Sequence, residues 1–186
     1  MPQREEGKSG MKTVILCGCS ASERRIAGSF SRYADVRYFG EDAVWQRGEE
    51  GQKLVVYSVP RLPRVQALPA VLVLGSELPA QTDGIRPCLL PVFDSSSRAA
   101  ARLLSQFGGA AIGCGTSPKD TFSLASFSEQ KAVVSLQRNL PALTGETVEP
   151  RDITLRLRRG CSVFEIMAFC AVMLLCGGSE QEMEVV

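Results

Sequence analysis

Short apolar runs alternate with helical patterns through the first 114 residues. The runs are nearly continuous in Val, Ile, Leu and Cys, which is typical of strands covered on both faces of a sheet. They predict strands at residues 12–17, 36–39, 54–59, 71–74, 89–93 and 110–114. Helices are predicted after Ser20, with Ile26 and Phe30 on the buried side, and over Ser97–Phe107 with Asp94 or Ser95 as cap. This order predicts an α/β fold with a mostly parallel, Rossmann-like sheet and helices on both faces.

The periodicity changes in the C-terminal half. Residues 120–127, 132–138 and 153–158 alternate apolar and polar positions without intervening helices, which predicts half-buried antiparallel strands. Ser162 and Glu165 then form a capping-box pattern before an apolar segment that ends near Cys176. That segment is shorter than the roughly 20 residues that span a bilayer, so it predicts a buried core helix.

The boundaries follow from these patterns. Residues 1–10 are polar and are expected to be a disordered N-terminal extension. Residues 11–178 are expected to form a single α/β domain, with the parallel part at 11–114, antiparallel strands at 120–158 and the buried helix at 162–176. The acidic end, 179–186, is expected to be frayed, and residues 40–52 around Trp45 are expected to be irregular. Pro60 and Pro63 argue against a regular helix between two of the strands.

Composition excludes several kinds of chemistry. The chain has no histidine, which removes Ser-His-Asp and Cys-His catalysis and imidazole zinc sites. The net charge of +1 provides no overall attraction to nucleic acid or anionic lipid. The seven cysteines lie mostly in apolar runs and are interpreted as buried thiols of a reducing cytoplasm. We therefore expect a cytoplasmic protein with no nucleic-acid partner, no membrane partner and no metal.

The stretch from about Leu89 to Gly178 resembles the second half of the central domain of the Mur ligase family. The matching pieces read LLPVFDSSSRAAARLLSQF, AAIGCGTSPKDTFSLASF, VVSLQR, ITLRLRR and SVFEIMAFCAVMLLCGG. The CG turn and the KDT, SLQR and VEP segments are also similar to a group of uncharacterised proteins from clostridia. The resemblance implies a strand ending in a Gly-containing turn, an antiparallel excursion, and a helix that returns to the core.

The ATP-binding features of that family have no match here. Mur ligases bind ATP through a Gly-rich loop ending in Lys-Thr or Lys-Ser, which cradles the phosphates. The corresponding turn, CGCSASER, has Gly18 as its one glycine and contains no lysine. Only Asp94, in FDSSSR, is a remnant of the acidic turn near the nucleotide base, and the C-terminal ligase domain has no counterpart. We therefore expect no ATP-dependent ligation and no cofactor.

Two turns at strand ends are candidate ligand sites. The first places Ser20 and Ser22 at a helix N-terminus, where free amides bind anions, although a plain cap by Ser20 and Glu23 explains the same residues. The second, GCGTSPKD, lies where parallel sheets bind ligands, although a tight connection between the parallel and antiparallel parts, with glycines chosen for backbone conformation, is the favoured interpretation. An anionic small molecule is expected between the two turns if any ligand binds. The candidate ligand-binding residues are Ser20, Ser22, Asp94, Thr116, Ser117, Lys119 and Asp120.

Two further clusters have simpler explanations. Cys17, Cys19 and Cys114 would form a metal or redox site if their strands were neighbours, but buried thiols are the favoured interpretation. The basic strip of Arg151, Arg156, Arg158 and Arg159 would suit a phosphate or an acidic partner. Strand alternation alone places Arg156 and Arg158 on a solvated face. No catalytic residue is assigned.

Two functions fit these observations. In the first, the chain is a non-catalytic binding or assembly module with a degenerate Mur ligase-like fold, which works through a protein partner, self-association or a held small ligand. In the second, it is an enzyme or small-ligand-binding protein that acts on an anionic metabolite at the C-terminal edge of the sheet. The missing histidine and the missing phosphate loop favour the first.

Overall fold

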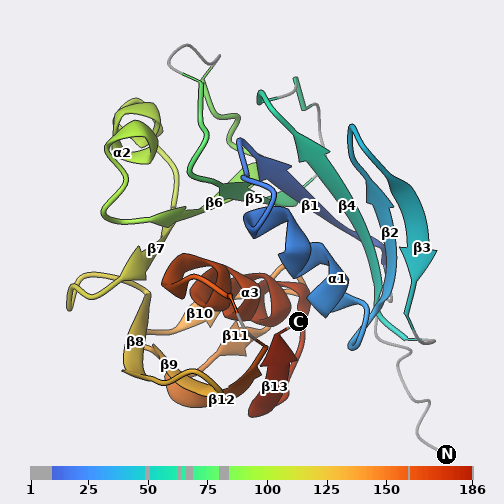
Figure 1. Cartoon of the computed structure of the whole chain (residues 1–186). Coiled ribbons are helices and arrows are strands. Elements are labelled where there is room, and N and C mark those ends of the chain that lie inside the picture. Colours follow the sequence, from blue (N-terminus) through green and yellow to red (C-terminus); the bar gives the residue numbers. More distant parts are fainter. Residues whose placement is uncertain are drawn as a thin grey trace, which may run out of the picture.

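Within the residues that it describes, the computed structural model contains one large sheet of eleven strands (Figure 1). The described residues are 10–48, 51–62, 64–65, 69–79, 84–158 and 160–185. The order of the strands in the sheet is β13-β12-β9-β8-β7-β6-β5-β1-β4-β2-β3. Their bounds are β1 Lys12–Cys17, β2 Asp35–Phe39, β3 Val44–Arg47, β4 Lys53–Val59, β5 Ala70–Leu74, β6 Leu89–Asp94, β7 Ile112–Gly115, β8 Phe122–Phe127, β9 Lys131–Leu136, β12 Arg151–Leu157 and β13 Glu182–Val185. A separate two-stranded sheet pairs β10 (Leu140–Pro141) with β11 (Thr147–Val148).

The central part of the large sheet is parallel, as predicted. β1 pairs in parallel with β4 on one side and with β5 on the other, and the parallel pairing continues to β2 and, through β6 and β7, to β8. Val14 and Leu16 point to one face of β1, Ile15 and Cys17 to the other, and all four are buried. A strand covered on both faces has no polar side, which explains its continuous apolar sequence.

Helices cover both faces of the parallel part, which confirms the predicted fold class. The 3-10 turn η1 (Glu23–Arg25), the short helix α1 (Ile26–Phe30) and the long helix α3 (Val163–Cys176) are on the face of Val14 and Leu16. The helix α2 (Arg98–Leu104) packs Ala100 on the opposite face. The helices α1 and α3 meet where the rings of Phe30 and Phe169 stack, with centroids 5.6 Å apart.

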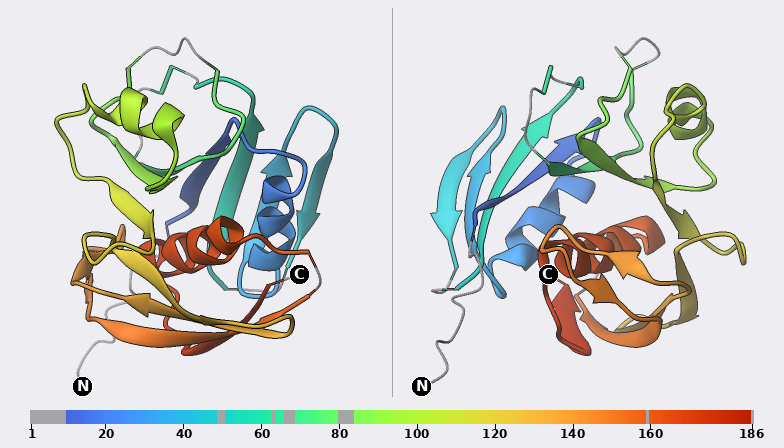
Figure 2. Two further views of the ribbon diagram at one scale, coloured as in Figure 1. Left: turned by 60° about the vertical axis from the view of Figure 1, so that its left-hand side comes forward. Right: turned by 180° about the vertical axis from the view of Figure 1, so that it is seen from behind.

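The C-terminal half forms the predicted antiparallel extension. β9 pairs antiparallel with both β8 and β12, and the sheet curls so that this part lies across α3 from the parallel strands (Figure 2). The helix α3 is therefore enclosed, and every residue from Phe164 to Cys176 is buried. It begins at the predicted capping box, in which Ser162 Oγ accepts from the Glu165 amide at 3.2 Å, and ends at Gly177 with a φ of +101°. None of the helices in the described ranges is long and apolar enough to cross a membrane.

The predicted helix at Ser97–Phe107 is too long. The helix α2 covers only Arg98–Leu104, because β6 extends to Asp94 and Ser97 supplies the cap, its Oγ accepting from the Ala100 amide at 3.3 Å. The prediction that Asp94 or Ser95 caps the helix is therefore wrong. Ala100 is the buried residue of this helix, so little tertiary packing holds a further turn.

Residues 40–52 are not irregular throughout. Residues 44–47 form β3, which pairs antiparallel with β2 at the edge of the sheet. Tyr38 and Trp45 lie directly opposite each other and their rings stack, with centroids 4.9 Å apart. This cross-strand aromatic pair stabilises a strand whose other side chains are exposed and carry no hydrophobic pattern.

The acidic C-terminus is not frayed over residues 182–185. These residues form β13, which pairs in parallel with β12. Met183 and Val185 are buried in the main core, and the Glu184 amide donates to the hydroxyl of Tyr33 at 2.6 Å. The expectation of disorder for residues 1–10 falls, apart from Gly10, outside the described residues, as do Pro63 and Arg159.

Candidate functional site

A cleft of about 480 Å³ opens at the C-terminal ends of the parallel strands. In the sheet, β4 and β2 lie on one side of β1, whereas β5, β6 and β7 lie on its other side. The direction in which the chain adds strands to the sheet therefore reverses between β1 and β5. Open α/β sheets bind ligands in the crevice at such a reversal. We call it the switch-point cleft. Its lining consists of Ser20, Ser22, Glu23, Leu74, Gly75, Ser76, Asp94, Ser97, Ser162, Val163 and Phe164.

The Glu23 carboxylate joins the two turns at the base of this cleft. Its Oε2 accepts from the Ser20 amide at 2.6 Å, and its Oε1 accepts from the Ser76 amide at 3.0 Å. The Ser76 hydroxyl donates to the same carboxylate at 3.0 Å, and Glu23 is only 7% exposed. The carboxylate therefore occupies the amides that a bound anion would use, and it brings a negative charge of its own.

The Ser20–Glu23 capping box predicted from the sequence is present. The Glu23 amide donates to Ser20 Oγ at 3.3 Å, while the Glu23 carboxylate accepts from the Ser20 amide. The helical segment that follows is short, three residues of 3-10 helix and then five of α-helix. These reciprocal bonds account for Ser20, whereas the Glu23 carboxylate also accepts from Ser76.

Glycines bring the two turns into direct contact. Gly18 has a φ of +60°, and a Cβ at this position would lie 2.9 Å from the Glu77 carbonyl oxygen. A Cβ on Gly75 would lie 2.5 Å from the Gly18 carbonyl oxygen. The Glu77 amide donates to the Gly18 carbonyl at 2.7 Å, which closes the contact. These glycines allow close packing of two backbones, and the first turn has no widened loop.

Asp94 lies at the end of β6 on the wall of the cleft. Its Oδ1 accepts from the amide of Ser96 at 2.8 Å and from the hydroxyl of Ser96 at 2.7 Å. Ser20 and Ser22 also line the cleft, with hydroxyl oxygens 3.0 Å apart. The structure thus brings three of the predicted ligand-binding residues to one cleft.

The turn at 116–120 does not line the switch-point cleft. β1 and β7 belong to one run of parallel strands, so both turns are at the same edge, but β5 and β6 separate them. Thr116 and Lys119 are exposed, and Ser117 Oγ accepts from the Lys119 amide at 3.2 Å. Binding of an anion between the two turns therefore stays a prediction.

Asp120 is buried and organises its own turn. It is 5% exposed, and its carboxylate accepts from the Ser117 amide at 2.8 Å and from the Ser95 hydroxyl at 3.1 Å. A Cβ on Gly113 or Gly115 would lie within 2.9 Å of this carboxylate. Neither glycine has a positive φ. These two glycines make room for the Asp120 carboxylate, and no left-handed backbone conformation requires them.

Several residues of the cleft were not predicted as site residues. Gly75 and Ser76 directly follow the apolar run of β5, so the strand-end rule could have found them. Ser97 and Ser162 could be predicted only as helix caps, and both also face the cleft. Their location at the cleft depends on long-range packing that local patterns do not encode.

The described part of the cleft wall carries hydroxyls and the carboxylates of Glu23 and Asp94, but no lysine or arginine. In the part of the chain that the structure describes, no group of three His, Cys, Asp or Glu side chains could hold a metal ion. Burial raises the pKa of Cys17 to about 11, and also raises the pKa of Cys19 and Cys114. Cys114 is not on a strand adjacent to β1, because β5 and β6 intervene. The thiols are therefore protonated at neutral pH and poorly suited to nucleophilic or redox chemistry.

Comparison with known proteins supports the fold. No protein-family model matches the sequence, and no curated protein matches it. Among solved structures, the chain is similar to the murein peptide ligase Mpl from Psychrobacter arcticus 273-4, with a TM-score of 0.53 and 10% sequence identity. The match covers 93% of this chain and 45% of that chain, so this chain spans less than half of the ligase. The chain thus has a Mur ligase-like α/β fold.

Proposed function

We propose that this protein is a non-catalytic binding or assembly module with a degenerate Mur ligase-like fold that does not bind ATP. The observation that carries the proposal is the buried Glu23 carboxylate, which accepts from the amides of Ser20 and Ser76. A phosphate bound at this turn needs those amides and a cation. Here the amides already serve an internal anion, and the turn contains no lysine.

The packing of the turns supports the same proposal. A phosphate-cradling loop needs several residues of backbone that curve around the ligand. The Gly18 and Gly75 backbones instead lie so close together that a Cβ added to Gly75 would be only 2.5 Å from the Gly18 carbonyl oxygen. Nucleotide phosphates would have to separate two turns that hydrogen bonds hold together.

The chemistry of the cleft also favours a role without catalysis. The chain lacks histidine, and burial raises the pKa values of Cys17, Cys19 and Cys114, so proton transfer near neutral pH would depend on carboxylates. Glu23 and Asp94 accept hydrogen bonds from neighbouring serines, and this holds them in structural roles. We propose that the module acts in the cytoplasm through a protein partner or self-association, as a relative of the clostridial group it resembles.

The alternative is an enzyme or a small-ligand-binding protein that acts on an anionic metabolite at the same sheet edge. The size and position of the switch-point cleft favour binding of some small molecule, since ligand pockets commonly have volumes of about 300–1,000 Å³. The two carboxylates and the absence of lysine and arginine from its described lining disfavour an anion there. A neutral, hydroxyl-bonding ligand fits this lining better.

Calorimetry with ATP and Mg²⁺ tests the proposal on the wild-type protein and on Glu23→Gln. We expect no binding of ATP in the switch-point cleft of either protein, because removing the carboxylate charge does not supply the missing cation. A dissociation constant in the low micromolar range that the cleft-filling variant Ser76→Phe abolishes would contradict the proposal, since it corresponds to about 8 kcal/mol of binding free energy. Binding that Ser76→Phe leaves unchanged lies outside this cleft and leaves the proposal intact. Binding to Glu23→Gln alone would show that a nucleotide site persists beneath the carboxylate, and would also contradict it.

Native mass spectrometry distinguishes the two candidate functions. A dimer, or a complex with a second protein that survives purification, is expected for the assembly module. A metabolite that co-purifies with the monomer supports the alternative. Ser76 is an exposed residue of the cleft lining, so the larger side chain in Ser76→Phe would fill the cleft. This variant should no longer retain such a metabolite, whereas its assembly should be unchanged.

A further inference from the structure

A second and larger groove, of about 840 Å³, lies between the α1 segment and the hairpin of β2 and β3. It shares no lining residue with the switch-point cleft. Five arginines line it: Arg24, Arg25, Arg32, Arg47 and Arg158. We call it the arginine groove. The overall net charge of only +1 conceals this local concentration of positive charge.

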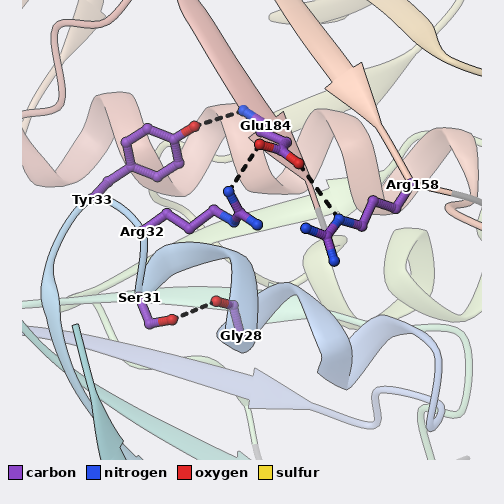
Figure 3. Close-up of polar contacts among 6 residues, drawn as sticks. All are labelled: Gly28, Ser31, Arg32, Tyr33, Arg158 and Glu184. Carbon is purple, nitrogen blue, oxygen red and sulfur yellow. Dashed lines mark hydrogen bonds and ion pairs between the residues drawn. The ribbon is translucent and has the colours of Figure 1, made fainter.

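Carboxylates neutralise only part of this charge. Asp42 lies 3.3 Å from Arg24, and Glu184 lies between Arg32 at 2.8 Å and Arg158 at 3.4 Å (Figure 3). Together, the five arginines of the lining and these two carboxylates carry a net charge of +3. One acid shared by two guanidinium groups leaves a positive charge at that end of the groove.

Two of the guanidinium groups have no carboxylate partner among the described residues. Arg25 donates to the backbone carbonyls of Gly160 at 3.2 Å and Ser22 at 3.4 Å. The Arg47 guanidinium lies over the ring of Trp45, 5.3 Å from its centroid. Both side chains are on exposed residues, so they are available to an external anion.

The shape of the groove allows close approach to the backbone. Arg24 of η1, Gly28 of α1 and Arg32 in the turn after α1 all line the groove and form one of its walls. A Cβ on Gly28 would meet no atom within 4 Å, so the space above the middle of this wall is open. Trp45 and Arg47 lie on one face of β3 and form the other wall.

We propose that the arginine groove binds the phosphate groups of a phosphate-bearing ligand, with Arg25 and Arg47 as the principal contacts. A phosphomonoester carries a charge of about −1.5 to −2 and three acceptor oxygens, so a compact chain of two or three phosphates is enough to neutralise the net charge of +3 in the groove. An acidic peptide would need three carboxylates within the groove to neutralise the same net charge of +3. Guanidinium groups also bind phosphate oxygens in pairs, which favours phosphate at a site built from arginines. This site goes beyond the proposed function, because it lies outside the switch-point cleft.

Calorimetry with inorganic tripolyphosphate tests the proposal on the full chain. The wild type should bind, and Arg25→Gln combined with Arg47→Gln should weaken binding about tenfold or more, since charge-assisted bonds are among the stronger ones. Gly28→Glu should abolish binding by placing a carboxylate in the open space, whereas Gly28→Ala should bind as the wild type does. Arg156→Gln is the matched control, because Arg156 is exposed, carries the same charge and does not line the groove. Melting curves establish that each variant is folded.

Two further probes identify the source of the phosphate. A single-stranded oligonucleotide that competes with tripolyphosphate would point to a nucleic-acid backbone, and tripolyphosphate binding without such competition would point to a small phosphorylated compound. Both results support the proposal. It is overturned if no phosphate probe binds, if Arg156→Gln weakens binding as much as the groove variants do, or if a poly-glutamate peptide binds and tripolyphosphate does not.

Discussion

The carboxylate of Glu23 accepts a hydrogen bond from the backbone amide of Ser76 at 3.0 Å, across the point where the strand order of the sheet reverses. The two residues are 53 positions apart, and each belongs to a turn that follows a central strand. An internal anion thus ties together the two turns at the edge where this kind of fold binds its ligands. The bond stabilises the fold and at the same time occupies the place for a phosphate.

Glu23→Gln should lower the free energy of unfolding by about 1–3 kcal/mol, because a neutral amide oxygen replaces a charged acceptor at a buried position. Urea denaturation at neutral pH measures the change. Glu77→Gln is the matched control: Glu77 is exposed in the neighbouring turn, and its effect should stay within about 0.5 kcal/mol. Equal effects of the two variants would show that the Glu23–Ser76 bond contributes nothing to stability.

Asp120 and Lys119 should behave in opposite ways although they are adjacent. Asp120→Ala removes a buried acceptor of the Ser117 amide and the Ser95 hydroxyl, and should destabilise the protein by about 1–3 kcal/mol. Lys119→Ala should change stability by less than about 0.5 kcal/mol, because Lys119 is exposed. If an anion binds near this turn, Lys119→Ala should weaken its binding while the melting temperature stays the same. A large loss of stability from Lys119→Ala would contradict this division.

The sequence predicts those helices and strands whose pattern lies within a single short segment of the chain. The apolar run of β1 and the Ser162–Glu165 box at the start of α3 are both local, and both are present. The edge strand β3 is stabilised by the Tyr38–Trp45 contact, and the sequence pattern does not predict it. A contact between residues on two different strands produces no alternation of apolar and polar residues within either strand. The capping role of Glu23 is visible in the sequence, but its bond to Ser76 depends on β5 lying beside β1. Local patterns do not encode that strand order.

Ala171→Asp should unfold the protein or make it insoluble. Ala171 is 0% exposed in α3, which the curled sheet encloses, so the new carboxylate would have no water and no partner. Ala101→Asp is the control, since Ala101 is exposed on α2 and the same substitution there should leave the protein folded. The soluble fraction after expression and the melting temperature measure the outcome. A soluble Ala171→Asp variant with an unchanged melting temperature would refute the buried position of α3.

Stability should decrease as the pH rises above 9. Burial raises the pKa of Cys17 from 9.0 to about 11 and that of Cys176 from 9.0 to about 12. A thiol with a raised pKa in the folded state stabilises that state below its unfolded pKa, and this contribution is lost as the pH rises through the folded value. Urea denaturation at pH 8, 9 and 10 measures the loss. The decrease should be smaller in Cys17→Ala, and an identical pH dependence in the variant and the wild type would exclude Cys17 as a contributor.

Met183→Ala should lower the free energy of unfolding by about 2–5 kcal/mol, as large-to-small substitutions in cores do. Met183 is 3% exposed on β13, the edge strand that pairs with β12, and its side chain is part of the main core. Glu182→Ala is the matched control on the same strand, because Glu182 is exposed and its side chain has no core contact to lose. Denaturation curves of the two variants show whether β13 is packed on the core in solution or is frayed. If β13 were frayed in solution, both substitutions would leave stability unchanged, and Glu184 would no longer hold Arg32 and Arg158 together at the end of the arginine groove.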